Sequence, residues 1–592
     1  MKHVFILALA ACAGSVGAAD FSPAAWPKEI RLRAEAQEAS WAPLQSRVVE
    51  GKAGMISATV SPLAVEAGLA MLRQGGSAAD AAASVALTQV ATQLGSVVSY
   101  AGIAMVVYYE AKTGKVYALD AGYGTWRGES DPASITPGDI SALTGGPAPA
   151  LGKDLGRQVL VPGFMAGIEA MQKRFGRYGL REALAPATYY AENGIAISPT
   201  LAGLFQMRKA YFNRTEAGRG FLAQSGRDVP LPGDIFRQLV LARTLKAVAR
   251  NGAAEMYSGQ WAAEFVKEVR REGGKADAAE LAAYRPLWSE AAATDVFGHH
   301  VYTNGGTSLA RYQFFTALHV AEALKLDQRG PYWEDGETLK ALGRIGQVVA
   351  SAPQLLPADE ALLKSKGADT SRAGQETKAY GQILAAALPE LFGLSDSGSH
   401  HSNAIVVADK NGNIAIVTHT INTVVWGDTG MVVGGIPLPD SAGFQQMRMA
   451  MLKPGARLPN EIADFLVLDA KRKPVLAGGS IGTSLHPEVL RLVLSHIGQH
   501  QPLAKAAAAP PLLINPDPAS YALPLARRPL LVAEGAFAPA VLDPLKKAGA
   551  TIVEAPAAQV SALRGTVAMV GFLGDTKAAP ESAGVMVYCG AE

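Results

Sequence analysis

The chain has 592 residues, more than a usual single domain, and its 49% hydrophobic and 18% charged residues are typical of a globular protein with an ample core. Its formal net charge is only +2, and it contains no basic block and no alternation of basic and aromatic residues. These features exclude a polyanion-binding surface, so we expect no nucleic-acid partner.

The first residues are typical of an export signal. Lys2 is followed by a short apolar run and by small residues up to Ala18, and this run is far below the roughly 20 residues of a membrane span. We therefore expect a signal peptide over residues 1–18 and a periplasmic or secreted protein. The run around Cys12 also resembles a lipoprotein box, so a lipid anchor at Cys12 is the alternative.

Cysteine and histidine usage argues against a metal centre. The two cysteines are Cys12 and Cys589, so removal of the signal leaves no internal disulfide. The ten histidines include no HExxH motif and no other metal-ligand spacing. We expect neither a metal nor another cofactor.

Strands and helices are expected in alternation along the first part of the chain. A strand over residues 54–59 precedes Ser61 and Pro62, which suit the cap and first turn of a helix that ends at a Gly-Gly pair. The other elements predicted up to residue 301 are an Ala-rich helix (77–94), a strand pair (103–109 and 116–119), a helix (163–174) and a strand near Val301.

The rest of the chain continues this mixture. The predicted elements are a helix followed by a polar run (370–398), a strand pair (465–468 and 474–477), an amphipathic helix (487–497) and two closing strands (567–572 and 585–588). The polar run over residues 394–399 is typical of a surface loop.

Residues 400–422 predict a β-hairpin. Two apolar runs rich in β-branched residues flank a turn with Asp409 at its first position and Gly412 at its last. This pattern suits a type I turn closed by a left-handed residue, and such a turn pairs Asp409 with Asn413.

The register of this hairpin brings polar side chains together. Counting back from the turn places Ser402 opposite Thr420, with Asn422 two residues further on the same face. A Ser, a Thr and an Asn therefore converge at one end of a buried hairpin. Such residues also close backbone hydrogen bonds at strand ends, so the hairpin alone leaves a purely structural role open.

The hairpin resembles the start of the small subunit in the γ-glutamyltransferase (γ-glutamyltranspeptidase) family. The resemblance rests on the turn over residues 409–413 and on Thr418-His419-Thr420-Ile421-Asn422. Ser402-Asn403-Ala404 stands where the family has a Thr-Thr-His nucleophile triplet. Residues 54–87 and 108–120 are also similar to the N-terminal region of the family over nearly its whole length.

The resemblance implies an α/β protein with the four-layer αββα sandwich of N-terminal-nucleophile hydrolases. It further implies self-cleavage between His401 and Ser402, which divides one folded unit into a large subunit (19–401) and a small subunit (402–592) that stay associated. Ser402 would be the nucleophile with its freed α-amine as base, Thr420 its hydroxyl partner, and Asn422 a hydrogen-bond partner of the substrate.

The implied chemistry is attack on the carbonyl of a small-molecule amide, formation of an acyl-Ser402 ester, and release to water or to an amine. The family stabilises the oxyanion with the backbone N–H groups of a Gly-Gly pair, and the matching residues are Gly482 and Thr483. Because Thr does not easily take a positive φ, the second position departs from the family pattern.

The positions that bind the donor substrate in the family depart further. An Arg, a Ser-Ser pair and an Asp recognise the γ-glutamyl group there, and the matching positions are Gly122, Asn460-Glu461 and approximately Gly443. The positive charge is absent and a negative charge stands where a carboxylate would bind. We expect glutathione to be a poor donor and an amide with an uncharged or more apolar acyl group to be the better substrate.

Two other interpretations are considered. A relative that keeps only the fold and binds without catalysis would also lose donor contacts, although the hydroxyls of Ser402 and Thr420 argue for chemistry. Residues 478–482 also fit the G-x-S-x-G motif of a conventional serine hydrolase with Ser480 as nucleophile. That mechanism needs an acid and then a histidine after Ser480, and the acid available before His500 is Glu488.

Overall fold

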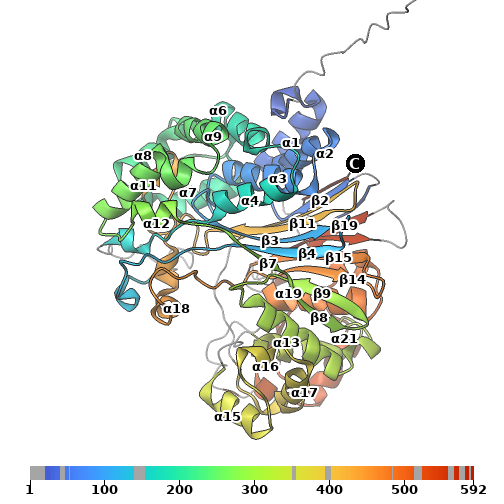
Figure 1. The fold of residues 1–592 in the computed structure, drawn as a ribbon. Coiled ribbons are helices and arrows are strands. Elements are labelled where there is room, and N and C mark those ends of the chain that lie inside the picture. The colour runs from blue at the N-terminus through green and yellow to red at the C-terminus, as the bar shows by residue number, and fades with distance from the viewer. Residues whose placement is uncertain are drawn as a thin grey trace, which may run out of the picture.

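The computed structural model describes residues 20–40, 47–51, 54–138, 154–349, 355–393, 402–482, 485–511, 523, 525–557, 560, 566–572, 580–585 and 588–591. Two sheets lie face to face, and helices cover the outer side of each (Figure 1). This arrangement confirms the predicted αββα sandwich. Residues 1–18, including Cys12, lie outside the described part of the chain.

The sheet that contains the predicted hairpin, here called the hairpin sheet, has the order β20-β2-β10-β11-β3-β4-β7 with antiparallel pairing throughout. Its strands are β2 (Gly54–Ala58), β3 (Ile103–Glu110), β4 (Lys115–Ala121), β7 (Leu287–Glu290), β10 (Asn403–Asp409), β11 (Ile414–Thr420) and β20 (Tyr588–Ala591). The hairpin strands β10 and β11 are central, and both are buried along their whole length, which explains their continuous apolar sequences.

The second sheet has the order β1-β19-β18-β15-β14-β9-β8 and is also antiparallel. Its strands are β1 (Arg47–Glu50), β8 (Ala292–Val296), β9 (His299–Thr303), β14 (Asp464–Leu468), β15 (Pro474–Ile481), β18 (Thr566–Phe572) and β19 (Pro580–Val585). Strands from before and after Ser402 occur in both sheets. The two parts of the chain are therefore interleaved.

Helices from the first half of the chain cover the hairpin sheet (Figure 1). They are α1 (Lys28–Ser40), α2 (Pro62–Arg73), α3 (Ala78–Thr92), α4 (Phe164–Phe175), α5 (Leu180–Ala183), α6 (Ala185–Asn193), α7 (Pro199–Phe212), α8 (Glu216–Leu222), α9 (Leu239–Asn251), α10 (Glu255–Ser258), α11 (Gln260–Arg271) and α12 (Ala278–Ala282). The predicted cap is confirmed, because the Ser61 hydroxyl accepts from the Ala64 N–H. The structure adds a capping box that Ser77 forms with Asp80 at the start of α3. Every residue of α3 is buried, and its small side chains let it pack closely on the hairpin sheet.

The helices on the second sheet are α13 (Ala310–Ala323), α14 (Gly336–Val349), α15 (Pro357–Ser365), α16 (Arg372–Gln375), α17 (Lys378–Ala387), α19 (Leu485–Val493), α20 (Leu503–Ala508) and α21 (Pro539–Lys547). A short helix, α18 (Gln446–Ala450), lies to one side (Figure 1). Three two-stranded sheets complete the fold: β5 (Ile195–Ala196) with β6 (Ile235–Phe236), β12 (Val432–Val433) with β13 (Ile436–Pro437), and β16 (Leu530–Ala533) with β17 (Ile552–Ala555). Among the described residues, every helix is too short or too polar to cross a membrane.

The predicted strand over residues 585–588 is wrong. Val585 ends β19 in the second sheet, whereas Tyr588 begins β20 in the hairpin sheet. Local β-propensity cannot indicate that the chain changes sheets at this point, because the change depends on which neighbouring strand is available.

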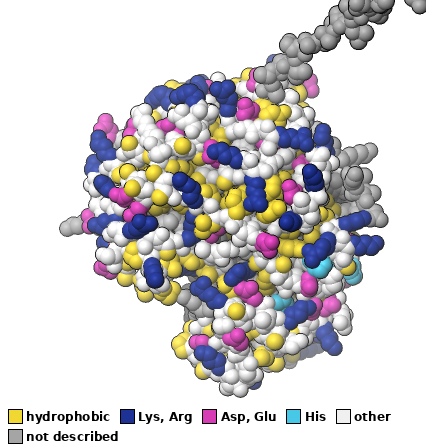
Figure 2. Space-filling model, in the orientation of Figure 1, with side chains coloured by type: hydrophobic (Ala, Val, Ile, Leu, Met, Phe, Trp, Pro, Cys, Tyr) yellow, Lys and Arg dark blue, Asp and Glu magenta, His cyan; other side chains and the backbone are white. Residues whose placement is uncertain are grey.

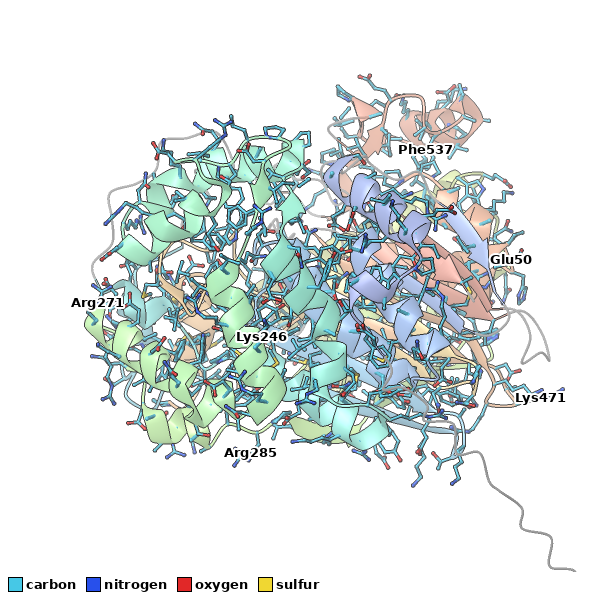
Figure 3. The ribbon with its side chains drawn as sticks, turned by 90° about the horizontal axis from the view of Figure 1, so that it is seen from above. Glu50, Lys246, Arg271, Arg285, Lys471 and Phe537 are labelled. Carbon is cyan, nitrogen blue, oxygen red and sulfur yellow. The ribbon has the colours of Figure 1, made fainter. Side chains whose placement is uncertain are left out.

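The surface carries both signs of charge. Lys and Arg side chains are spread over the face drawn in Figure 2 with Asp and Glu side chains among them, in keeping with the low net charge. Seen from above, Arg271 at the end of α11 and Lys471 in the β14–β15 turn mark opposite sides of the molecule (Figure 3).

Candidate active site at the end of the central hairpin

The turn of the hairpin forms as predicted. Gly412 has a φ of 83°, its N–H donates to the Asp409 carbonyl at 2.9 Å, and the Asp409 N–H donates to the Asn413 carbonyl at 3.0 Å. The Asp409 carboxylate also accepts, at 3.0 Å, from the N–H of Ala78, the first residue of α3. Asp409 therefore closes the turn with its backbone and ties it to the central helix with its side chain.

The predicted register is also confirmed. Asn403 lies opposite His419 and Ala404 opposite Thr418, so the next pair toward the open end is Ser402 with Thr420. Ser402 directly precedes β10 and is half-buried, while Thr420 ends β11 and is buried. Because side chains alternate along a strand, these two hydroxyls share the face that is turned toward the second sheet.

Asn422 follows in a left-handed conformation with a φ of 54°. Its backbone N–H donates to the Thr420 hydroxyl at 3.0 Å. The intervening carbonyl of Ile421 accepts hydrogen bonds from the Ser441 hydroxyl at 2.6 Å and from the Tyr123 hydroxyl at 3.1 Å. The chain is therefore held from two directions just beyond β11.

The start of β10 is held by a residue that the sequence pattern does not indicate. The Thr59 hydroxyl accepts from the Ala404 N–H at 3.0 Å, and the Thr59 N–H donates to the Ala404 carbonyl at 3.0 Å. These bonds continue the β2–β10 ladder one residue beyond Ala58 and fix the backbone two residues from Ser402.

The predicted oxyanion residue Gly482 directly follows β15 and has a φ of 94°. Strand β15 pairs with β14, whose first residue, Asp464, lies opposite Gly479. The last residues of β15 and the first residues of β14 therefore lie at the same end of two inner strands of the second sheet. His401 and Thr483 lie outside the described residues.

Two of the predicted donor positions, Gly122 and Asn460, lie against Met105, which is opposite Thr418 in the hairpin sheet. The Asn460 side-chain N–H₂ lies 3.6 Å from the Met105 sulfur, and a Cβ at Gly122 would lie 3.1 Å from its methyl carbon. The surrounding side chains are apolar and buried: Ile103, Tyr123, Ile135, Leu160, Ala442, Met449, Leu458 and Ile462. We call this group of side chains the Met105 cluster. Gly443 directly follows one of its members, Ala442.

The charges at these positions differ from the prediction. Glu461 is paired with Arg448 at 2.5 Å, so its negative charge is compensated. The guanidinium of Arg457 reaches Gly122, donates to its carbonyl at 2.9 Å, and lies 3.6 Å from the Asp120 carboxylate. A positive charge is therefore present near Gly122 after all, but it comes from a segment distant in sequence and is already paired.

Burial shifts the pKa values of two ionisable groups at β11. His419 lies on one face of this strand, and Asp464 of β14 contacts Thr418 on the other face. Burial lowers the pKa of His419 to about 3, and its Nε2 lies 2.7 Å from the Gln89 amide oxygen, so this imidazole is neutral. Burial raises the pKa of the Asp464 carboxyl to about 7, although hydrogen bonds from Thr418 and Asn304 oppose the shift.

The structure argues against a conventional serine hydrolase. Ser480 lies within β15 opposite Val567 rather than on a strand-to-helix turn, and its buried hydroxyl makes no hydrogen bond to any described residue. Glu488 is fully buried and bonded to Arg491. The motif match is accidental, because no described histidine or acid contacts the Ser480 hydroxyl.

Residues 64–582 match the family model of gamma-glutamyltranspeptidase. The glutathione hydrolase proenzyme of Escherichia coli (strain K12) is 24% identical over 496 residues, which cover 78% of this chain and 81% of the relative. The acylase ACY 1 proenzyme of Pseudomonas sp. (strain SE83) is 25% identical over 497 residues, 79% of this chain and 83% of the relative. The crystal structure of cephalosporin acylase from Bacillus halodurans has the same fold, with a TM-score of 0.72 at 20% identity over 93% of this chain and 98% of that one.

Proposed function

Because this chain belongs to the γ-glutamyltranspeptidase family, we propose that it cleaves itself between His401 and Ser402 and then acts on amides through an acyl-Ser402 ester. The chain is an enzyme of the amide hydrolase and acyltransferase class. The observation that carries the finer proposal is the convergence of Ser402, Thr420 and Asn422 at the end of the central hairpin. The apolar start of the chain supports export of the enzyme.

In the self-cleavage step, the Ser402 hydroxyl attacks the carbonyl carbon of His401. The hydroxyl proton passes to the departing amide nitrogen, which becomes the α-amine of Ser402. Water then hydrolyses the resulting ester and leaves a carboxylate on His401. The bond between Ala404 and Thr59 and the bond from Ser441 to the Ile421 carbonyl support this step, because they hold β10 just after Ser402 and the chain just after Thr420.

In catalysis, the freed α-amine takes the proton of the Ser402 hydroxyl, which attacks the amide carbonyl of the substrate. A free α-amine has a pKa of about 7.7–8.0 and is therefore available as a base near neutral pH. Backbone N–H groups of Gly482 and Thr483 stabilise the oxyanion, and Thr420 and Asn422 contact the nucleophile and the substrate. The departing amine takes the proton, and water or another amine then releases the acyl group.

The Met105 cluster supports an uncharged or apolar acyl group. The nearby cations Arg448 and Arg457 already face carboxylates, so a γ-glutamyl carboxylate would have to displace one of these pairs. An apolar group makes no such demand. We therefore propose that glutathione is a poor donor for this enzyme.

Self-cleavage is tested by intact mass and N-terminal sequencing of the purified protein. We expect two fragments, the smaller beginning with Ser402, and a single uncut chain for Ser402→Ala. Ser402→Thr is the matched variant, because it keeps the hydroxyl and should still cleave. An uncut wild-type chain would contradict the proposal and favour a relative that binds without catalysis.

The acyl preference is tested with p-nitroanilides that differ only in their acyl group. We expect kcat/KM for neutral apolar acyl groups to exceed that for the γ-glutamyl group by at least about tenfold, because displacing an ion pair costs on the order of 1 kcal/mol or more. A preference for the γ-glutamyl substrate would contradict this part of the proposal and leave the nucleophile assignment untouched.

A further inference from the structure

We propose that Asp464, acting with Thr418 and Gly479, is a positioning unit that joins the two sheets beneath the nucleophile and sets how the Gly482 turn faces Ser402. The inference rests on the proposed function and adds residues that the family resemblance did not assign.

The unit is a buried hydrogen-bonded bridge. The Thr418 hydroxyl on β11 donates to one oxygen of the Asp464 carboxyl at 2.6 Å, across the space between the sheets. The Asn304 side-chain N–H₂ donates to the other oxygen at 3.2 Å, and the Asp464 N–H donates to the Asn304 side-chain oxygen at 2.9 Å. All three side chains are buried. The carboxyl is therefore held in one orientation from both sheets.

Gly479 makes room for this bridge. It lies opposite Asp464 in the second sheet, and a Cβ at this position would lie 2.8 Å from the Asp464 carboxyl oxygen and 3.1 Å from the Thr418 hydroxyl. The same Cβ would lie 3.2 Å from the Cβ of Ala404. Any larger residue would separate the sheets at this point, so the glycine is needed for close approach.

The bridge lies a few residues from each half of the catalytic centre. Thr418 is two residues before Thr420 on the same face of β11, and Ala404 is two residues after Ser402 on β10. Gly479 is three residues before Gly482, about 10 Å along an extended chain. A change in sheet separation here would be carried directly to the distance between nucleophile and oxyanion donors, where about 1 Å of misplacement can cost a hundredfold in rate.

The chemistry of the bridge is unusual for a purely structural contact. Among the described residues no cation pairs with Asp464, and the groups that contact its carboxyl are the neutral Thr418 and Asn304. A buried carboxyl without a cation is costly, and an apolar contact between the sheets would avoid that cost. Proteins depart from energetically favourable packing of this kind mainly at functional sites.

The test compares the bridge with a matched hydrogen bond in the same strand. The Thr303 hydroxyl donates to the Asp464 carbonyl at 2.6 Å, but this bond lies within the second sheet. Thr418→Val and Thr303→Val each remove one buried hydroxyl of the same size. We expect Thr418→Val to lower kcat and the self-cleavage rate by about tenfold or more with little change in KM, and Thr303→Val to lower only the melting temperature.

Thr418→Ser keeps the hydroxyl and should restore the rates. Equal loss of melting temperature and unchanged kcat in both valine variants would overturn the proposal, because the bridge would then be structural only.

A second measurement separates this inference from the proposed function. The measurement uses the Ser402→Ala protein, which lacks the proposed nucleophile. In this protein, Asp464→Ala should speed amide hydrogen exchange in both β11 and β15. Thr303→Val should speed exchange only in the second sheet. Faster exchange confined to one sheet would overturn the inference. If Asp464→Ala speeds exchange in both sheets but the wild-type enzyme is inactive, only the proposed function is contradicted.

Discussion

At the residue scale, Ser402 departs from the family threonine by one methyl group. A β-branched nucleophile has a restricted χ1, and serine lacks this restriction. The surrounding backbone is nevertheless held tightly, by Thr59 on one side and by Ser441 and Tyr123 on the other. In the proposed mechanism, this anchoring fixes the backbone that carries the hydroxyl, while the χ1 of Ser402 stays less restricted than that of a threonine.

Gly482 offers a residue-scale prediction with a matched control. Its φ of 94° and that of Gly226, at 81°, both lie in the left-handed region, and a Cβ at Gly226 would meet open space. Alanine should cost each site about 1 kcal/mol of stability. Because Gly482 lies at the proposed oxyanion position, Gly482→Ala should also lower kcat by about a hundredfold.

Thermal melts and steady-state kinetics of the two variants check this prediction. If Gly226→Ala and Gly482→Ala keep the same kcat, then the Gly482 N–H does not stabilise the oxyanion.

At the element scale, helix α1 shows how a weakly marked segment is secured. The sequence around residues 28–40 lacks a strong apolar stripe and does not predict this helix. Its buried Glu38 accepts from the Ser61 hydroxyl at 2.7 Å, from the Leu63 N–H at 3.3 Å and from the Gln93 side chain at 3.1 Å. The carboxyl thereby fastens α1 to the N-terminal end of α2.

This contact predicts a pH-dependent effect on stability. Burial raises the pKa of Glu38 to about 7 from its ordinary 4.5, so the fold favours the neutral carboxyl. The resulting stabilisation is present below the ordinary pKa and is lost as the pH rises through about 7. The free energy of unfolding of Glu38→Gln, relative to that of wild type, should therefore rise by up to about 3 kcal/mol as the pH is raised from about 5 to about 8. The buried side-chain oxygen of Gln93 has no hydrogen-bond partner among the described residues, so the side-chain amide that Glu38→Gln introduces can donate to it once the Gln93 amide flips.

Thermal melts at both pH values measure this difference. Glu35→Gln is the control, because Glu35 lies on the same helix and pairs with Arg31 at the surface. Equal behaviour of the two variants would contradict the assignment to Glu38.

At the scale of the whole molecule, the proposed cleavage point divides the chain without dividing the fold. The central pair β10 and β11 belongs to the small fragment and lies between β2 and β3 of the large one. The second sheet is likewise shared, with β14 paired to β9. Separating the fragments would require breaking ladders in both sheets.

We therefore predict that the two fragments remain together until the fold is lost. Size-exclusion chromatography of cleaved protein should give one species in native buffer, and the fragments should separate only in concentrated guanidinium chloride, in the same transition that removes the helical circular dichroism signal. Release of the small fragment in native buffer would contradict the shared sheets.

What could be predicted from the sequence was local or carried by the family resemblance. The turn at Asp409 and Gly412, the cap at Ser61 and the alternation that pairs Ser402 with Thr420 depend on residues close in sequence, so short-range rules were sufficient. The resemblance carried the four layers. The sequence by itself therefore determined the hairpin and placed the three polar side chains at its end.

Only the tertiary structure decided which groups, distant in sequence, meet around the end of the hairpin. Arg457 reaches Gly122, Arg448 compensates Glu461, and Asp464 crosses between the sheets to Thr418. None of these pairs is close in sequence or follows a strand or helix period. They form because the tertiary fold brings the segment over residues 446–463 against the end of β4 and packs the two sheets face to face, so that each polar group bonds to the partner that lies opposite it.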